Sequence, residues 1–262
     1  MNTSDSTPNG TPNDTQDAGG GSSGFPRWLK WGLLGALGVL VVGYGLIFLY
    51  ANVLNDSPDE LDQSDLDAAL VATSTVGATD SSTPPATTEP ATGTWNITKA
   101  SELGYRVTEV LFGVDTEGVG RTNQIDGALV IDGTRVTEAN FVVDVASIES
   151  DDGRRDDQFR GRIMSADQFP TATFVLSEPI ELGTEAVEGA SVETTATGEL
   201  TLRGVTNPVT FDVAAELANG RIGVLGNIPV VFADYEISNP SVAGITTEDN
   251  GLLEFVLVFE PA

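Results

Sequence analysis

The sequence predicts an all-β domain, an antiparallel barrel of about eight strands, preceded by one transmembrane α-helix. Residues 94–262 contain short runs of alternating apolar and polar side chains separated by turn residues, which favours β-strands. Ahead of them, the run Trp31–Tyr50 contains no charged residue and as a helix would span roughly 30 Å, the thickness of a bilayer core. The segments around this run are rich in Ser, Thr, Asp and Pro, a composition that buries too little apolar surface to fold.

Composition excludes several classes of function. The 262-residue chain has a net charge of −27, from 12 Lys and Arg against 39 Asp and Glu. We therefore expect no nucleic-acid partner, because phosphate binding depends on clustered basic residues. Cys and His are absent, which excludes a disulfide framework, a thiolate nucleophile, a Ser-His-Asp triad and the usual zinc sites. A pair of carboxylates for glycoside hydrolysis is the remaining catalytic alternative, but no spacing singles one out. We predict no catalytic residue, no metal site and no enzymatic activity.

The N-terminal region divides into a tail and a membrane anchor. Residues 1–26 are predicted to be a disordered cytoplasmic tail, and residues 27–54 a transmembrane helix. Arg27 and Lys30 precede the apolar run and acidic residues follow it, so the positive-inside rule places the N-terminus in the cytoplasm and the C-terminal domain outside the plasma membrane. A cleaved signal peptide is the alternative. It is disfavoured because the apolar run is too long and no convincing cleavage site follows it.

Residues 55–93 are predicted to form a disordered stalk. The segment is acidic at first and then rich in Thr and Pro, so charge repulsion and proline should keep it extended. Within it, residues 61–73 can form a transient helix. The stalk would separate residues 94–262 from the membrane without fixing their orientation.

Eight runs carry the strand prediction for residues 94–262. Asn219-Gly220 between two runs is a strong hairpin signal, because both residues tolerate positive φ, and Asp132-Gly133 and Asn250-Gly251 support further turns. Residues 156–170 break the β pattern and predict one or two short helices before Pro170. The mostly short connections favour an antiparallel barrel or sandwich. The predicted strands are 105–112, 128–132, 140–148, 171–176, 198–204, 208–217, 221–232 and 252–259.

Alternation within these runs assigns the two faces of the sheet. Asp144 and Glu254 mark the solvent face of their strands, which leaves their apolar neighbours pointing inward. This one-sided pattern is expected of an up-and-down barrel with an apolar interior. Such a barrel is either filled by side chains or encloses one ligand, and the pattern does not distinguish the two. The predicted interior residues are Phe141, Val143, Val145, Phe174, Leu200, Leu202, Val209, Phe211, Val213, Val230, Phe232, Leu253, Phe255 and Leu257.

Two blocks of sequence resemble a known family. The run RRDDQFRGRIMSADQFP (154–170) leading into TATFVL is similar to the arginine- and aspartate-rich loop and following strand of the YceI-like family. The run TGELTLRGVTNPVTFDV (197–213) resembles a second block of that family, in the expected order. The resemblance implies a lipocalin-like barrel that holds a polyisoprenoid, a quinone-like lipid or another amphiphilic lipid, with the interior residues as its contacts. Members often carry histidines in the early strands; this chain has none, so no role of theirs is transferred.

Four arginines fall within nine residues of this otherwise acidic domain: Arg154, Arg155, Arg160 and Arg162. One interpretation places one or two of them at the barrel mouth, bound to the polar or phosphate head group of a lipid. The alternative is a solvated loop whose charge is neutralised by neighbouring aspartates, with the Arg155-Asp156 pair closing the loop. Arg203 is expected to face solvent or an adjacent loop.

The sequence thus predicts a membrane-tethered, extracytoplasmic lipid-binding protein with no cofactor besides the bound lipid. The alternative is a packed, non-catalytic β scaffold that interacts with another protein of the cell envelope. Protein partners are not predicted.

Overall fold

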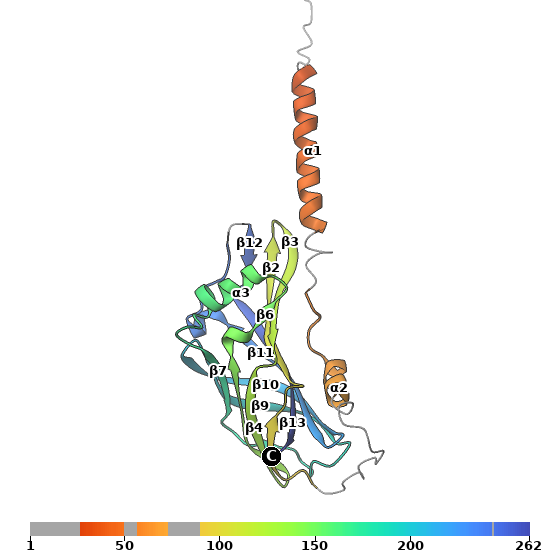
Figure 1. Ribbon diagram of the computed structural model, residues 1–262, viewed down its shortest axis with the longest axis vertical. Helices are drawn as coiled ribbons and strands as arrows, with labels where there is room; N and C mark the ends of the chain where they lie inside the picture. The colour runs from red at the N-terminus through yellow and green to blue at the C-terminus, as the bar shows by residue number, and fades with distance from the viewer. Residues whose placement is uncertain (1–26, 50–56, 73–89, 243) are drawn as a thin grey trace, which may run out of the picture. The chain divides into compact units, whose positions relative to one another are not determined.

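A computed structural model describes residues 27–49, 57–72, 90–242 and 244–262 (Figure 1). The chain forms two compact units, Met1–Gly45 and Leu46–Ala262. The predicted tail, residues 1–26, and a large part of the predicted stalk, residues 73–89, lie outside the described residues.

The N-terminal helix α1 (Arg27–Leu49) occupies the position of the predicted membrane span. Within the described ranges, however, no helix qualifies as a membrane span by length and apolarity. The transmembrane assignment of residues 27–54 and the orientation that follows from it therefore stay predictions.

Eight antiparallel strands form a closed barrel. Their order around the ring is the order along the chain, and the last strand pairs back onto the first through Trp95↔Pro261 and Ile97↔Phe259. The prediction of an antiparallel eight-stranded barrel with short helices is confirmed. The ring strands are β1 (Gly93–Ile97), β4 (Ile125–Asp132), β5 (Arg135–Asp144), β7 (Thr171–Leu176), β9 (Ser191–Leu202), β10 (Val205–Ala218), β11 (Arg221–Val231) and β13 (Asn250–Pro261).

A β-hairpin extends one end of the barrel beyond the ring. Strand β2 (Glu102–Leu111) pairs with the same edge of β13 as β1 does, but nearer the start of β13, with Leu253↔Tyr105 in register. Strand β3 (Val114–Thr122) completes the hairpin. Two short strands pair with the hairpin, β6 (Glu149–Ser150) with β3 and β12 (Ile245–Thr247) with β2. A third, β8 (Ile180–Glu181), pairs with β5 of the ring. In Figure 1 the hairpin, β12 and helix α3 (Gly153–Gln158) lie at one end of the barrel, and the C-terminus lies at the other.

Most of the predicted strands are found, with shifted ends. Each of the eight predicted runs overlaps a strand, but the run 105–112 overlaps β2, outside the ring, and β1 and β3 were not predicted. The run 140–148 ends early: Asp144 caps a short 3-10 helix, η3 (Val145–Ser147), by accepting from the N–H of Ala146 at 3.0 Å. The predicted helical segment, residues 156–170, overlaps only the end of α3, which begins at Gly153, and contains a π-helical turn, η4 (Phe159–Ile163).

The turn predictions are right in two of three cases. Asn219 and Gly220 have positive φ of 56° and 70° in the β10–β11 hairpin, and Gly133 has φ of 59° between β4 and β5. The Asn250-Gly251 turn was wrong, because both residues already belong to β13 and pair with β11. A glycine is required at 251 for a different reason: a Cβ there would lie 2.8 Å from the Arg106 carbonyl oxygen.

Residues 57–72, here called the external strap, pack against the outside of the barrel. Their helix α2 (Gln63–Ala72) buries Leu66 and Leu70 on the outward-facing side chains Val256 and Val258 of β13. The leucines fit because a Cβ at Gly223 of β11 would meet the Leu66 side chain at 2.5 Å. The predicted extended stalk therefore does not describe residues 57–72.

Candidate functional site

The barrel interior contains two separate apolar cavities. Cavity 1 has a volume of about 170 Å³ and lies toward the end formed by the β4–β5 and β10–β11 turns, where Glu185 and Glu216 are its charged lining residues. Cavity 2 has a volume of about 120 Å³ and lies toward the β2–β3 hairpin. Successive inward-facing side chains of one strand can line different cavities. On β5, Phe141 lines cavity 1 and Val143 lines cavity 2.

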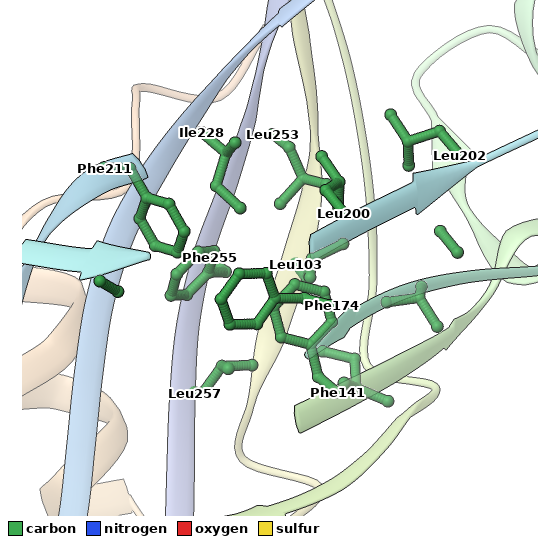
Figure 2. Packing of buried hydrophobic residues seen from close by; sticks show 14 of the residues in the cluster. Leu103, Phe141, Phe174, Leu200, Leu202, Phe211, Ile228, Leu253, Phe255 and Leu257 are labelled. Atoms are coloured by element: carbon green, nitrogen blue, oxygen red, sulfur yellow. The ribbon is translucent and has the colours of Figure 1, made fainter. Parts of the chain in front are cut away.

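Four phenylalanine rings form a layer between the cavities. Phe141 of β5, Phe174 of β7, Phe211 of β10 and Phe255 of β13 point toward one another (Figure 2). Their ring centroids are 5.4 Å apart for 141–174 and 174–211, 5.8 Å for 141–255 and 6.1 Å for 211–255, which closes a cycle. All four rings line cavity 1. We call this group the phenylalanine layer.

Glycines on neighbouring strands make room for two of these rings. A Cβ at Gly198 of β9 would lie 2.5 Å from the Phe174 ring, and a Cβ at Gly226 of β11 would lie 2.5 Å from the Phe255 ring. An aromatic ring that covers a strand glycine shields the backbone and recovers contact area that the glycine lacks. The layer is thus specified by glycines as well as by phenylalanines.

Cavity 2 is lined mostly by apolar residues together with a few polar side chains. Its apolar residues include Val143 and Leu253, while Tyr105, Glu109 and Arg155 also line it. The Tyr105 ring stacks on Phe159 with centroids 4.6 Å apart. Burial raises the pKa of the Tyr105 phenol. Burial also raises the pKa of the Glu109 carboxyl, although the nearby Arg155 opposes this shift.

Residues 95–259 match the model of the YceI-like domain family. The chain belongs to the YceI-like domain family. A UPF0312 protein of Vibrio vulnificus strain YJ016 is 30% identical over 150 residues, covering 53% of this chain and 69% of the relative. A UPF0312 protein of Vibrio campbellii is 30% identical over 148 residues, with the same shares covered.

A solved structure shares the fold at low identity. The polyisoprenoid binding domain from Saccharophagus degradans, implicated in plant cell wall breakdown, aligns with a TM-score of 0.53 and 18% identity. The alignment covers 65% of this chain and 99% of that domain. The family resemblance read from the sequence is confirmed.

The structure divides the predicted interior residues of the YceI-like domain between the cavities. Leu200 and Val209 line neither cavity. Leu200 is fully buried in the hydrophobic core, and Val209 is half-buried and packs against that core. Contact of the others with a ligand stays a prediction. Cavity 1 is lined by Phe141, Phe174, Phe211, Val213, Phe255 and Leu257. Cavity 2 is lined by Val143, Val145, Leu202, Val230, Phe232 and Leu253.

The four arginines have different environments, and the structure does not gather them at one point. Arg155 lines cavity 2 and forms an ion pair with Asp151. Arg160 binds the loop before α3, donating to the Ala146 carbonyl at 2.8 Å. Arg154 is exposed. Arg162 is also exposed and donates to the Pro240 carbonyl at 2.8 Å.

Asp156, not Arg155, closes the loop of the YceI-like arginine- and aspartate-rich segment. Its carboxylate accepts from the Ser150 amide at 2.8 Å and from the Ser150 hydroxyl at 2.6 Å. The expectation for Arg203 holds, because this residue donates to the Glu236 carbonyl of an adjacent loop and lies over the Phe169 ring at 6.0 Å.

Sequence reasoning missed a buried ion-pair network on the outer face of the barrel. Glu254 was expected to mark the solvent face; it does point outward, but its side chain is 0% exposed. Arg106 donates to its carboxylate at 3.2 Å and Arg121 at 2.8 Å. Leu61 of the external strap adds its amide at 3.4 Å. The carbonyl oxygens of Pro58 and Asp59 accept from Arg106 and Arg121, so the strap covers the network and is bound by it.

Proposed function

We propose that this YceI-like protein binds an apolar lipid of isoprenoid type, such as a polyisoprenoid or a quinone-like lipid, inside its barrel and performs no catalysis on it. One observation carries the proposal: the barrel core leaves two apolar cavities, about 170 and 120 Å³ in volume, instead of being filled throughout. The shared fold with a polyisoprenoid binding domain from Saccharophagus degradans supports this ligand class.

The cavity sizes define how such a lipid would fit. An apolar cavity of about 150 Å³ accepts a molecule the size of benzene, so each cavity accepts one short apolar group without rearrangement. A longer chain must pass through the phenylalanine layer. Each methylene transferred from water contributes about 0.8 kcal/mol, which supplies the driving force for moving the rings.

We also propose that the protein is held at the plasma membrane by residues 27–54, with its N-terminus cytoplasmic and its barrel extracytoplasmic. The support is the uncharged run Trp31–Tyr50, with basic residues before it and acidic residues after it. A tether of this kind would keep the barrel close to the membrane that supplies its ligand.

Mass spectrometry of co-purified lipid tests the binding proposal. The full chain is purified in mild detergent, extracted with organic solvent, and compared with a detergent blank. We expect an isoprenoid-type lipid in the wild-type extract. A matched pair of variants places the lipid in the barrel: Ala196→Leu fills space in cavity 1, whereas Thr195→Leu adds the same side chain on the exposed face of β9. The first should lose lipid and the second should retain it.

The packed scaffold is the second candidate function, favoured by the contiguous phenylalanine layer that fills the middle of the barrel. Extracts without lipid, or equal lipid in both leucine variants, would contradict the carrier proposal and leave the scaffold, which would act through a partner protein of the cell envelope.

A further inference from the structure

One end of the barrel carries an exposed apolar tip. Phe112, in the turn between β2 and β3, is 60% exposed, and Val242 is 42% exposed. The two belong to one small structure, because the Phe112 amide donates to the Gly244 carbonyl at 2.9 Å and Val242 forms a bridge with Ile245. Phe112 adopts a positive φ of 48°, a conformation that a bulky residue rarely takes. The ring lies over Gly244, where an added Cβ would come within 2.3 Å of it, so the turn and the 242–245 bridge hold Phe112 in a fixed, exposed position.

Two exposed arginines lie on the helical segment after β6, at the same end of the barrel as this tip. Arg162 donates to the carbonyl of Pro240, two residues before Val242. Arg154 lies on α3, which Figure 1 places at the same end as β12 and the β2–β3 hairpin. Neither pairs with a carboxylate among the described residues. In a chain with a net charge of −27, two exposed arginines without an ion pair at the same end as an apolar tip match the layered chemistry of a bilayer surface, with phosphates outside and hydrocarbon beneath.

The described part of the external strap begins at this same end of the barrel, on its outside. Ser57 donates to the Glu117 carbonyl of β3 at 2.7 Å, only three residues from the start of that strand, Val114. The strap then runs toward the opposite end, where the Asn219 side chain donates to the Leu70 carbonyl at 3.5 Å. The chain that arrives from the predicted membrane span therefore meets the barrel near the apolar tip.

The length of that connection favours the tip over the opposite end. From Tyr50 to Ser57 the chain reaches at most about 25 Å. The tip lies roughly 10 Å beyond Glu117 along β3, whereas the far end of β13 lies about 36 Å in the other direction at 3.3 Å per residue. Contact between the tip and the membrane leaves slack in the connection, but contact at the opposite end requires full extension and a strong tilt.

We propose that this end of the barrel is its membrane-docking surface and that it binds the phospholipid bilayer: Phe112 and Val242 enter the interfacial region, and Arg154 and Arg162 bind lipid phosphates. The proposal rests on the membrane tether proposed above. It has a functional consequence, because Pro240 also lines cavity 2. Docking turns the end of the barrel that contains cavity 2 toward the bilayer, so an apolar lipid moves between membrane and barrel with a short path through water.

Single-cysteine labelling tests this orientation directly, because the chain contains no native cysteine. The full chain is reconstituted in phosphatidylcholine vesicles containing one quarter phosphatidylglycerol and nitroxide-labelled lipid. An environment-sensitive fluorophore is attached either to Thr246→Cys in β12, which is exposed beside the tip, or to Thr134→Cys in the exposed β4–β5 turn at the opposite end. We expect lipid nitroxides to quench the label at 246 several-fold more than the label at 134. Equal quenching at the two sites, or stronger quenching at 134, would overturn the proposal.

Variants separate docking from folding and from lipid binding. Phe112→Ser and Val242→Ser, made in the Thr246→Cys background, should reduce the quenching several-fold; Val175→Ser, an exposed valine on the barrel wall, should leave it unchanged. Arg154→Gln with Arg162→Gln should reduce quenching more in vesicles with phosphatidylglycerol than in pure phosphatidylcholine. Bound lipid is measured in the same samples by mass spectrometry. Lipid in the barrel without stronger quenching of the label at 246 refutes docking but not lipid binding. Stronger quenching at 246 without lipid in the barrel refutes lipid binding but not docking.

Discussion

Replacement of Glu254 by Gln tests whether a buried ion-pair network fixes the external strap to the barrel. The change keeps the size of the side chain and removes its charge. Arg106, whose side chain is 7% exposed, and Arg121, at 16%, then lose the carboxylate that lies between them. The amide of Leu61 also loses a charged acceptor.

The magnitude follows from the partners that remain. Breaking a buried ion pair by removal of one charge typically costs about 3–5 kcal/mol. Arg106 keeps its ion pair with Glu117, and Arg121 keeps Glu102 at 3.8 Å, so neither guanidinium is left without a carboxylate. We therefore expect the free energy of unfolding to fall by about 3 kcal/mol, the lower end of that range.

Glu260→Gln is the matched control, since it is the same substitution on the same strand. Glu260 pairs with Arg221 at 2.8 Å, but its side chain is 45% exposed. Exposed pairs typically contribute below 1 kcal/mol, so we expect a loss of about 0.5 kcal/mol. Denaturant unfolding of the full chain in detergent gives both values, and amide hydrogen exchange at Leu61 reports release of the strap. Equal losses in the two variants, or unchanged protection of Leu61 in Glu254→Gln, would refute the reasoning.

Three further predictions concern the interior and the strap. Phe174→Ala should lower the free energy of unfolding by about 3–5 kcal/mol and shift the lipid recovered by mass spectrometry toward longer chains. The control Val175→Ala, at an exposed position on the same strand, should change neither stability nor lipid length. An unchanged lipid length in Phe174→Ala would count against the layer as a barrier. Burial raises the pKa of Glu109 from 4.5, so ionisation of its carboxyl destabilises the folded state as pH rises through the raised pKa. Glu109→Gln should therefore leave the free energy of unfolding unchanged below pH about 4.5 and increase it near neutrality. Urea unfolding that gives the same difference between wild type and Glu109→Gln at low pH and near neutrality would contradict this. Leu66→Ala should lower the free energy of unfolding by about 2–5 kcal/mol. Val71→Ala, on the exposed side of α2, should have little effect in the same thermal melts. Equal effects of the two substitutions would show that the strap is not bound through its leucines.

Much of the barrel could be predicted because its strands obey one period. In β10 and β13, alternation of apolar and polar residues identified the interior positions, such as Phe211 and Phe255, that the structure places around the cavities. Strand β3 was missed because its sequence, VDTEGVGRT, lacks large apolar residues. Its glycines are required by packing: a Cβ at Gly120 would lie 2.6 Å from the Tyr105 ring, a contact between strands that no local pattern reveals.

A helix was expected within residues 61–73, where α2 is found, but the packing of the strap on the barrel was missed for a related reason. Its acidic composition indicated a solvated stalk, and its outward partners on β13 were assigned to solvent because alternation identifies faces but not what covers them. A local signal was present, since Asp62 precedes the helix and accepts from the Ser64 amide at 2.7 Å, as an N-cap residue does. The spacing of Leu66 and Leu70 places both on one side of a helix. The partner of that side, a groove over Gly223, requires the folded barrel.

If the barrel binds lipid as proposed, the phenylalanine layer would select among lipids by chain length. Each aromatic pair is worth about 0.5–1.5 kcal/mol beyond its buried area, so disrupting all four contacts of the layer costs roughly 2–6 kcal/mol. At about 0.8 kcal/mol per buried methylene, a chain offsets this cost with roughly three to eight methylenes beyond those that fit in one cavity. A short apolar molecule would gain too little and stay in a single cavity, whereas an isoprenoid-length chain would gain enough to open the layer and occupy both. Selectivity for chain length would then arise from side chains in the middle of the barrel, and a ligand's head group would contribute little to it.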